Sequence, residues 1–63
     1  MADITVRIVH RDGNMARYFV YDRHGVEIAQ VHRDVSKELE RAKRQKKGLD
    51  IILAEVEAKR FGE

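Results

Sequence analysis

The sequence contains no cysteine, no proline and no tryptophan, and only 6% of its residues are aromatic. Without cysteine the chain has neither disulfides nor thiolate metal clusters, so its stability must come from packing or from association with another chain. It also lacks an apolar run near the roughly 18 residues that a membrane-spanning helix requires, and its N-terminus does not have the pattern of a signal peptide. We therefore expect a cytoplasmic protein without a membrane partner.

The chain is also short, at 63 residues. A domain of this size hides only about 60% of the surface that its unfolded chain exposes, so we expect residues 1–63 to form a single domain with a small core. A deep, enclosed pocket needs more chain than this. We expect a function in binding and no enzymatic activity.

Charged residues make up 38% of the sequence, but the net charge is only +2. The basic excess is concentrated in the middle, because residues 34–48 carry +3, residues 1–33 carry +1 and residues 49–63 carry −2. A local excess of this kind can attract a polyanion even when the total charge is small.

Three short runs rich in β-branched and aromatic residues occupy the first half of the chain, over about 3–9, 15–22 and 26–32. The dipeptides Asp12-Gly13 and His24-Gly25 separate them, and each glycine can supply the positive φ that a hairpin turn requires. The pattern predicts a three-stranded antiparallel β-meander.

Two registers compete for the first hairpin. A two-residue turn pairs Val6 with Phe19, whereas a three-residue turn pairs Val6 with Tyr18. The second separates apolar from polar residues better, and applied to the next hairpin it pairs Val20 with Ile28. It predicts a core face made of Ile4, Val6, Ile8, Ala16, Tyr18, Val20, Val26 and Ile28. The opposite face then holds Thr5, Arg7, Val9, Met15, Arg17, Phe19, Tyr21, Glu27, Ala29 and Val31.

Residues 35–61 show the apolar spacing of a helix that packs on one side, with Asp34 or Ser36 as the expected N-cap. Gly48 follows a lysine-rich turn and precedes Asp50, a candidate cap for a second helix. The region therefore forms one long helix or two short ones with a break at Gly48, and we favour the break slightly. The expected fold class is α+β, in the order βββα or βββαα.

An unbroken helix would extend past the sheet, since about 26 helical residues span roughly 39 Å and seven-residue strands only about 23 Å. Its uncovered apolar end would need a partner, and we expect a homodimer. The candidate interface residues are Ile51, Ile52, Leu53 and Val56 of the helical region, with Phe19 and Tyr21 of the opposite sheet face.

The opposite face combines arginines with aromatic rings, which can pair phosphates and stack on unpaired bases. A basic helical segment could add contacts to phosphates. The candidate nucleic-acid-binding residues are Arg7 and Arg17 of the sheet and Arg41, Lys43, Arg44 and Lys47 of the helical region. If the helices cover one face of the sheet, these two groups point in different directions. The same sheet face also suits self-association.

The chain offers no pattern typical of a metal site or of catalysis. The histidines (His10, His24 and His32) lack the paired spacing of metal ligands on a helix. The only serine, Ser36, lies where it can cap a helix, and the acids form no convergent pair. We expect no metal and no cofactor.

Three antiparallel strands followed by a helix resemble, in architecture, the N-terminal DNA-binding modules of tyrosine-type phage integrases and plant domains of similar shape. The resemblance covers residues 4–47 and does not extend to the local sequence pattern around the third strand and the helix entry. It implies that the sheet lies in the major groove of DNA, with Arg7, Arg17 and Tyr21 at the DNA.

The sequence thus predicts a small binding protein. Our first hypothesis is a homodimeric regulator that associates with DNA or RNA, of the kind that bacteria, phages or plasmids encode. The alternative is a protein–protein interaction module, an adaptor or inhibitor that docks on a larger protein partner and binds no nucleic acid.

Overall fold

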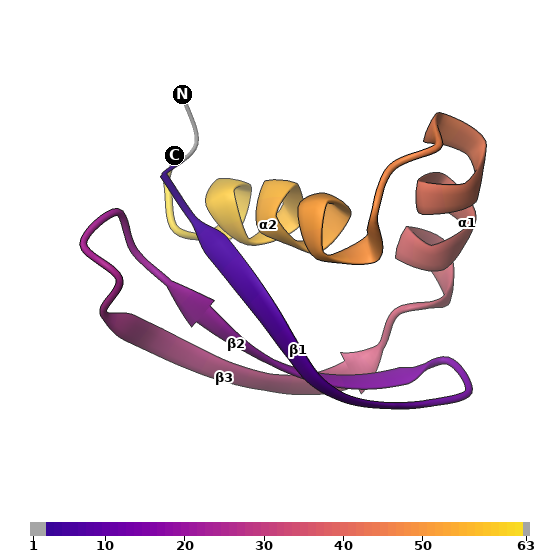
Figure 1. Ribbon diagram of the computed structural model, residues 1–63, viewed down its shortest axis with the longest axis horizontal. Coiled ribbons are helices and arrows are strands. Elements are labelled where there is room, and N and C mark those ends of the chain that lie inside the picture. Colours follow the sequence, from indigo (N-terminus) through magenta and orange to yellow (C-terminus); the bar gives the residue numbers. More distant parts are fainter. Residues whose placement is uncertain (1–2, 63) are drawn as a thin grey trace.

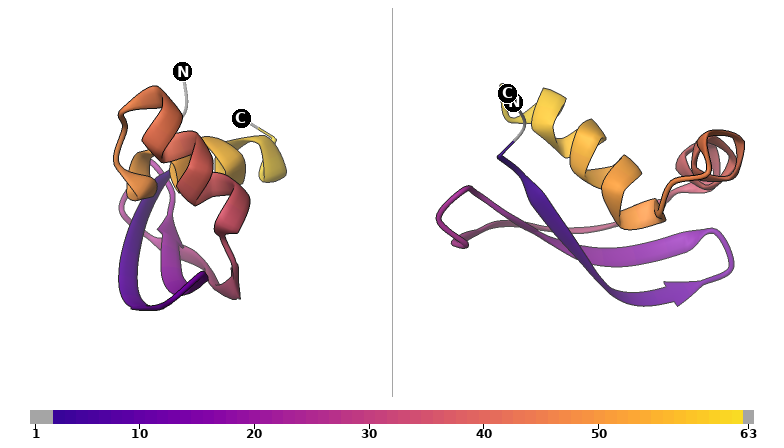
Figure 2. Two further views of the ribbon diagram at one scale, coloured as in Figure 1. Left: turned by 90° about the vertical axis from the view of Figure 1, so that its right-hand side faces the viewer. Right: turned by 45° about the horizontal axis from the view of Figure 1, so that its top comes forward.

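A computed structural model describes residues 3–62 and has three strands followed by two helices. The elements are β1 (Thr5–Asp12), β2 (Met15–Tyr21), β3 (Glu27–Asp34), α1 (Ser36–Gln45) and α2 (Leu49–Arg60). The strands form one antiparallel sheet in the order β1-β2-β3. Both helices lie on the same side of this sheet, and no part of residues 3–62 covers its other side (Figures 1 and 2). The α+β class and the β-meander are confirmed, in the βββαα form.

The first hairpin has neither of the two predicted registers. Its turn is Gly13-Asn14, one residue later than expected, and Gly13 has a φ of +61°. A bulge at Val9 then shifts the pairing, so that Val6 lies opposite Val20. This differs by two residues from the favoured register, and a two-residue shift leaves every side chain on the same face of the sheet. The expected core residues of β1 and β2 therefore still face the helices.

The second turn forms as expected at Asp22–Gly25. The Gly25 N–H donates to the Asp22 carbonyl at 3.0 Å, and the Asp22 carboxylate accepts from the amides of His24 and Val26. This carboxylate is thereby held in its charged form, and its pKa is lowered, chiefly by the hydrogen bond from Val26.

The register after that turn differs from the prediction by one residue. A bulge at Ile28 places Ala29, instead of Ile28, opposite Val20. A one-residue slip exchanges the two faces of a strand. Ala29 and Val31 consequently pack against the core, whereas Val26 and Ile28 are 57% and 38% exposed. The expected faces of Val26, Ile28, Ala29 and Val31 were therefore wrong, whereas Glu27, which precedes the bulge, is paired with Tyr21 on the expected face.

The break between the helices is confirmed, but Gly48 is not the residue that ends α1. Lys46 adopts the left-handed conformation, with a φ of 55°, and the Lys47 N–H donates to the Ala42 carbonyl at 3.0 Å. This is the hydrogen-bond pattern of a Schellman C-cap, in which glycine usually occupies the left-handed position. Gly48 is instead the N-cap of α2, in extended conformation, and a Cβ there would lie 2.6 Å from Oδ1 of Asp50.

The N-cap residues of the two helices also differ from the expected ones. Val35 is the N-cap of α1, although the Asp34 carboxylate accepts the Ser36 N–H at 2.8 Å. The side chain of Asp50 lies in the first turn of α2 and makes no cap hydrogen bond there.

The bend at residues 46–48 folds α2 back over the sheet, which changes the candidate interface. Ile52 and Leu53 are completely buried within the chain, so their assignment to a dimer interface was wrong. Ile51 remains 51% exposed and Val56 is half-buried. Over residues 3–62, neither helix has the length and apolar character needed to cross a membrane.

Candidate nucleic-acid interface

The uncovered side of the sheet, here called the outer face, is organised in rows that cross all three strands. Directly paired residues of neighbouring strands share a face, so the pairing defines each row. From one end of the sheet to the other, the four rows are Thr5–Tyr21–Glu27, Arg7–Phe19–Gln30, His10–Arg17–His32 and Asp12–Met15–Asp34.

The two middle rows contain arginine, histidine, glutamine and phenylalanine, and no acid. The guanidinium carbon of Arg7 lies 5.7 Å from the centroid of the Phe19 ring, within the range of a cation–π interaction. Arg17 lies two residues before Phe19 on β2 and is exposed. Acidic residues occur in the two end rows, so positive charge is concentrated at the centre of the outer face.

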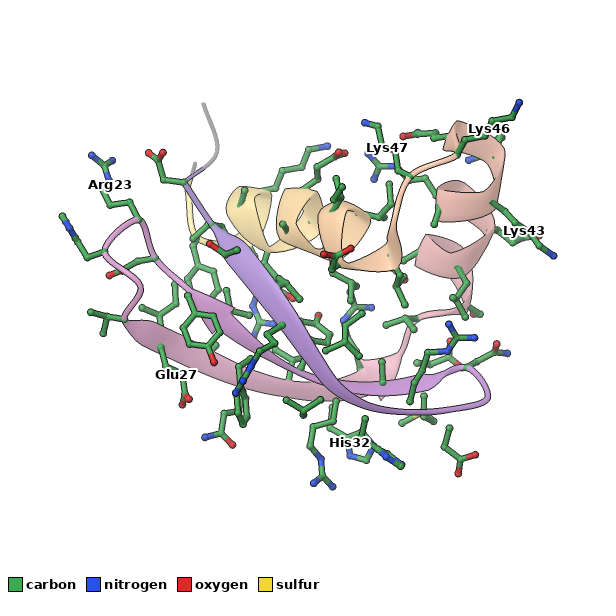
Figure 3. All side chains as sticks on the ribbon, viewed as in Figure 1. Arg23, Glu27, His32, Lys43, Lys46 and Lys47 are labelled. Atoms are coloured by element: carbon green, nitrogen blue, oxygen red, sulfur yellow. The ribbon has the colours of Figure 1, made fainter. Side chains whose placement is uncertain are left out.

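A shallow hollow of about 280 Å³ lies on the outer face beside β3, lined by Arg17, Gln30, Val31 and His32. The Gln30 amide nitrogen donates to Glu27 at 3.0 Å, which holds that side chain along the strand. His32 and Glu27 both extend from the sheet on the side opposite the helices (Figure 3). The hollow therefore offers the guanidinium of Arg17, the amide of Gln30 and the imidazole of His32. Phe19 lies beside it, paired with Gln30.

The basic residues of the helical region lie elsewhere. Lys43, Lys46 and Lys47 extend from the helical layer, away from the side where His32 lies (Figure 3). Arg41 and Lys47 also share one carboxylate, since Arg41 contacts Oε1 of Glu55 at 2.7 Å and Lys47 contacts Oε2 at 3.2 Å. The structure thus separates the candidate residues into Arg7 and Arg17 on the outer face, an α1–α2 ion-pair group, and the exposed Lys43 and Arg44.

Beneath the outer face, on the helix side, lies a buried polar chain that sequence reasoning missed. The Tyr18 hydroxyl donates to Oε2 of Glu57 at 2.6 Å and accepts from Nε of Arg33 at 3.1 Å. Arg33 in turn contacts Glu38 of α1 at 3.2 Å. Glu57 is only 1% exposed, and its spacing of four residues from Leu53 was the one available signal that it faces the core.

This environment changes the ionisation of the residues in the chain. Burial, together with the hydrogen bond to Glu57, raises the pKa of Tyr18 from its ordinary value to about 12. Burial alone would lower the pKa of Arg33, but its hydrogen bonds to Tyr18 and Glu38 outweigh that effect and raise it. The neutral phenol of Tyr18 and the charged guanidinium of Arg33 are therefore the stable forms. These hydrogen-bonded side chains act as a structural support beneath β2.

The histidines do not form a metal site with the acids. Within residues 3–62, no group of three or more histidine, aspartate or glutamate side chains is arranged to hold a metal ion. His10 and His32 belong to the same row of the outer face, with Arg17 between them.

Comparison with protein-family models, with curated proteins and with solved structures finds no match.

Proposed function

We propose that the outer face binds single-stranded nucleic acid. The observation that carries the proposal is the cation–π pair of Arg7 and Phe19, at the centre of a sheet face that none of the described residues of the helices or turns covers (Figure 1). Exposed rings on a sheet can stack on unpaired bases, and neighbouring arginines can pair phosphates or stack in the same way. The contact between the Phe19 ring and the Arg7 guanidinium therefore offers base stacking and phosphate pairing at one position.

The spacing along β2 supports a strand with unstacked bases as the ligand. Phe19 and Tyr21 are two residues apart and therefore about 7 Å apart on the same face. Two successive rings can each accept one base, at about 1–3 kcal/mol per stacked base. In a duplex the bases are already stacked on each other, so this face would reach only their edges and the phosphates.

The basic residues of α1 do not share this face, so Arg7 and Arg17 are the cations we assign to it. The homodimer, the regulatory role and the cytoplasmic location stay predictions. A protein partner docked on the outer face is the alternative. Its affinity would depend on contacts with Phe19 and Tyr21 and would not change with salt concentration.

The test is fluorescence anisotropy with a labelled single-stranded oligonucleotide of mixed sequence, at several salt concentrations. We expect Phe19→Leu to cost about 1–3 kcal/mol of binding free energy, because one stacking ring is removed. Arg7→Gln should weaken binding and reduce the slope of log affinity against log salt by about 0.7, because one phosphate of the single strand is no longer neutralised.

Lys59→Gln is the matched control, because Lys59 is exposed on α2, which lies on the side of the sheet opposite the outer face (Figure 1). It should leave affinity unchanged. Circular dichroism of every variant verifies that the fold is intact. Absence of binding at low salt, or tighter binding to a duplex of the same length, would contradict the proposal.

A further inference from the structure

A concave region lies on the helix side of the sheet, between the β1–β2 turn and α1. Its volume is about 620 Å³. We call it the hairpin groove, and its polar lining consists of Arg11, Asn14, Ser36, Lys37, Glu40 and Lys43. It is therefore separate from the outer face, although β1 borders both.

The bulge at Val9 brings Arg11 into this groove. With regular alternation from Ile8, whose side chain packs against the core, His10 would face the helices and Arg11 would face outward. The bulge exchanges them, because His10 is paired with outward-facing Arg17 and Arg11 with the buried Ala16. Two adjacent residues of this edge strand thus present an imidazole to the outer face and a guanidinium to the groove.

The groove carries an excess of positive charge, and its cations form no ion pairs with the described acidic residues. Lys37, Glu40 and Lys43 are three residues apart and so lie on one side of α1, facing Arg11. Across residues 3–62, none of the three cations has a carboxylate oxygen within 4.0 Å. Arg41 and Lys47 differ in this respect, since both are paired with Glu55.

We propose that the hairpin groove binds phosphate groups of the same nucleic-acid strand whose bases lie on the outer face. This rests on the proposed function. The strand leaves the outer face at the row that contains His10 and Arg17, crosses the free edge of β1, and enters the groove at Arg11. Lys37 and Lys43 then contact its phosphates, while Glu40 opposes them and limits the affinity.

The experiment compares two single-stranded oligonucleotides, one of about 4 nucleotides and one of about 12, both within the range of about 4–16 nucleotides that known single-strand sites cover. The variants are the double substitution Lys37→Gln/Lys43→Gln, the single substitution Glu40→Gln, and Lys59→Gln as the charge control. The shorter probe reaches the outer face only, whereas the longer probe reaches both surfaces.

We expect the double variant to bind the longer probe several-fold more weakly, with a salt slope reduced by about 0.7 for each phosphate that the lysines no longer neutralise. The same variant should bind the shorter probe as the wild type does. Glu40→Gln should tighten binding of the longer probe, and Lys59→Gln should change neither.

The two proposals fail in different ways. If the shorter probe binds but the double variant affects both probes equally, or neither, the groove proposal is overturned and the outer-face function stands. If neither probe binds the wild type, both proposals are overturned.

Discussion

Replacing Tyr18 with phenylalanine removes one oxygen atom from the centre of the molecule and keeps the ring that fills the core. That oxygen donates to Glu57 at 2.6 Å and accepts from Arg33 at 3.1 Å. Oε1 of Glu57 has no hydrogen-bond partner in the described chain, and its nearest cation is Arg60 at 3.7 Å. Tyr18→Phe therefore leaves a carboxylate that is 1% exposed without any hydrogen-bond donor.

The expected cost is large compared with the total stability. A hydrogen bond to a charged group contributes about 1.5–3 kcal/mol, and leaving a buried charged partner unsatisfied adds to that, so we expect a loss of about 3 kcal/mol. A chain of this length is stable by roughly 3–9 kcal/mol. The midpoint of thermal unfolding should fall by about 12–24 °C.

Urea unfolding followed by circular dichroism measures this loss, and a second substitution identifies its cause. If the unsatisfied carboxylate is responsible, Tyr18→Phe/Glu57→Leu should be more stable than Tyr18→Phe alone, because an apolar side chain of similar size needs no donor. Tyr21→Phe is the control, on the outer face, and should change stability by no more than about 0.5 kcal/mol. The reasoning is refuted if Tyr18→Phe matches the wild type or if the two core substitutions are simply additive.

Two further predictions concern stability alone. The pKa of Tyr18 is raised in the folded state to about 12, so its contribution to stability is complete below pH 10 and is lost as the pH rises toward 12. The urea midpoints at pH 8 and pH 11 should therefore differ less in Tyr18→Phe than in the wild type. An equal difference in the two proteins would contradict this. Lys46→Gly should stabilise the protein by about 1 kcal/mol, because glycine adopts the left-handed conformation of residue 46 without strain. Lys43→Gly, within α1, should instead cost about 1 kcal/mol. If thermal unfolding shows a loss of stability at both positions, Lys46 is not strained.

The elements themselves followed from local patterns in the sequence. Alternation and turn residues predicted the three strands, and Asp22–Gly25 formed the expected turn because its aspartate accepts two amides ahead of it. The bulges at Val9 and Ile28 had no local signal. Each inserts one residue whose position is decided by what the neighbouring side chains contact across the sheet, so the register of β3 could not be predicted from its own sequence.

The candidate sites were predictable to different degrees. Arg7, Arg17, Phe19 and Tyr21 were expected on one face, and their rows agree with that because β1 and β2 kept the expected orientation. The hairpin groove was not predictable, since it depends on the bulge that turns Arg11 toward α1. The Tyr18–Glu57 contact joins residues 39 positions apart, and the four-residue spacing of Glu57 from Leu53 indicates its side of α2 but not its partner on β2.

A series of side-chain hydrogen bonds runs from Glu38 through Arg33 and Tyr18 to Glu57, and it joins α1, β3, β2 and α2. If α2 separates from the sheet, Tyr18 loses its acceptor, and if α1 separates, Arg33 loses a carboxylate. Partial opening of either helix thus breaks a link in this series of contacts, so we expect the two helices to open together as one cooperative unit. Amide hydrogens in the middle of both helices are then expected to exchange with solvent at a common rate, as parts of one cooperative unit.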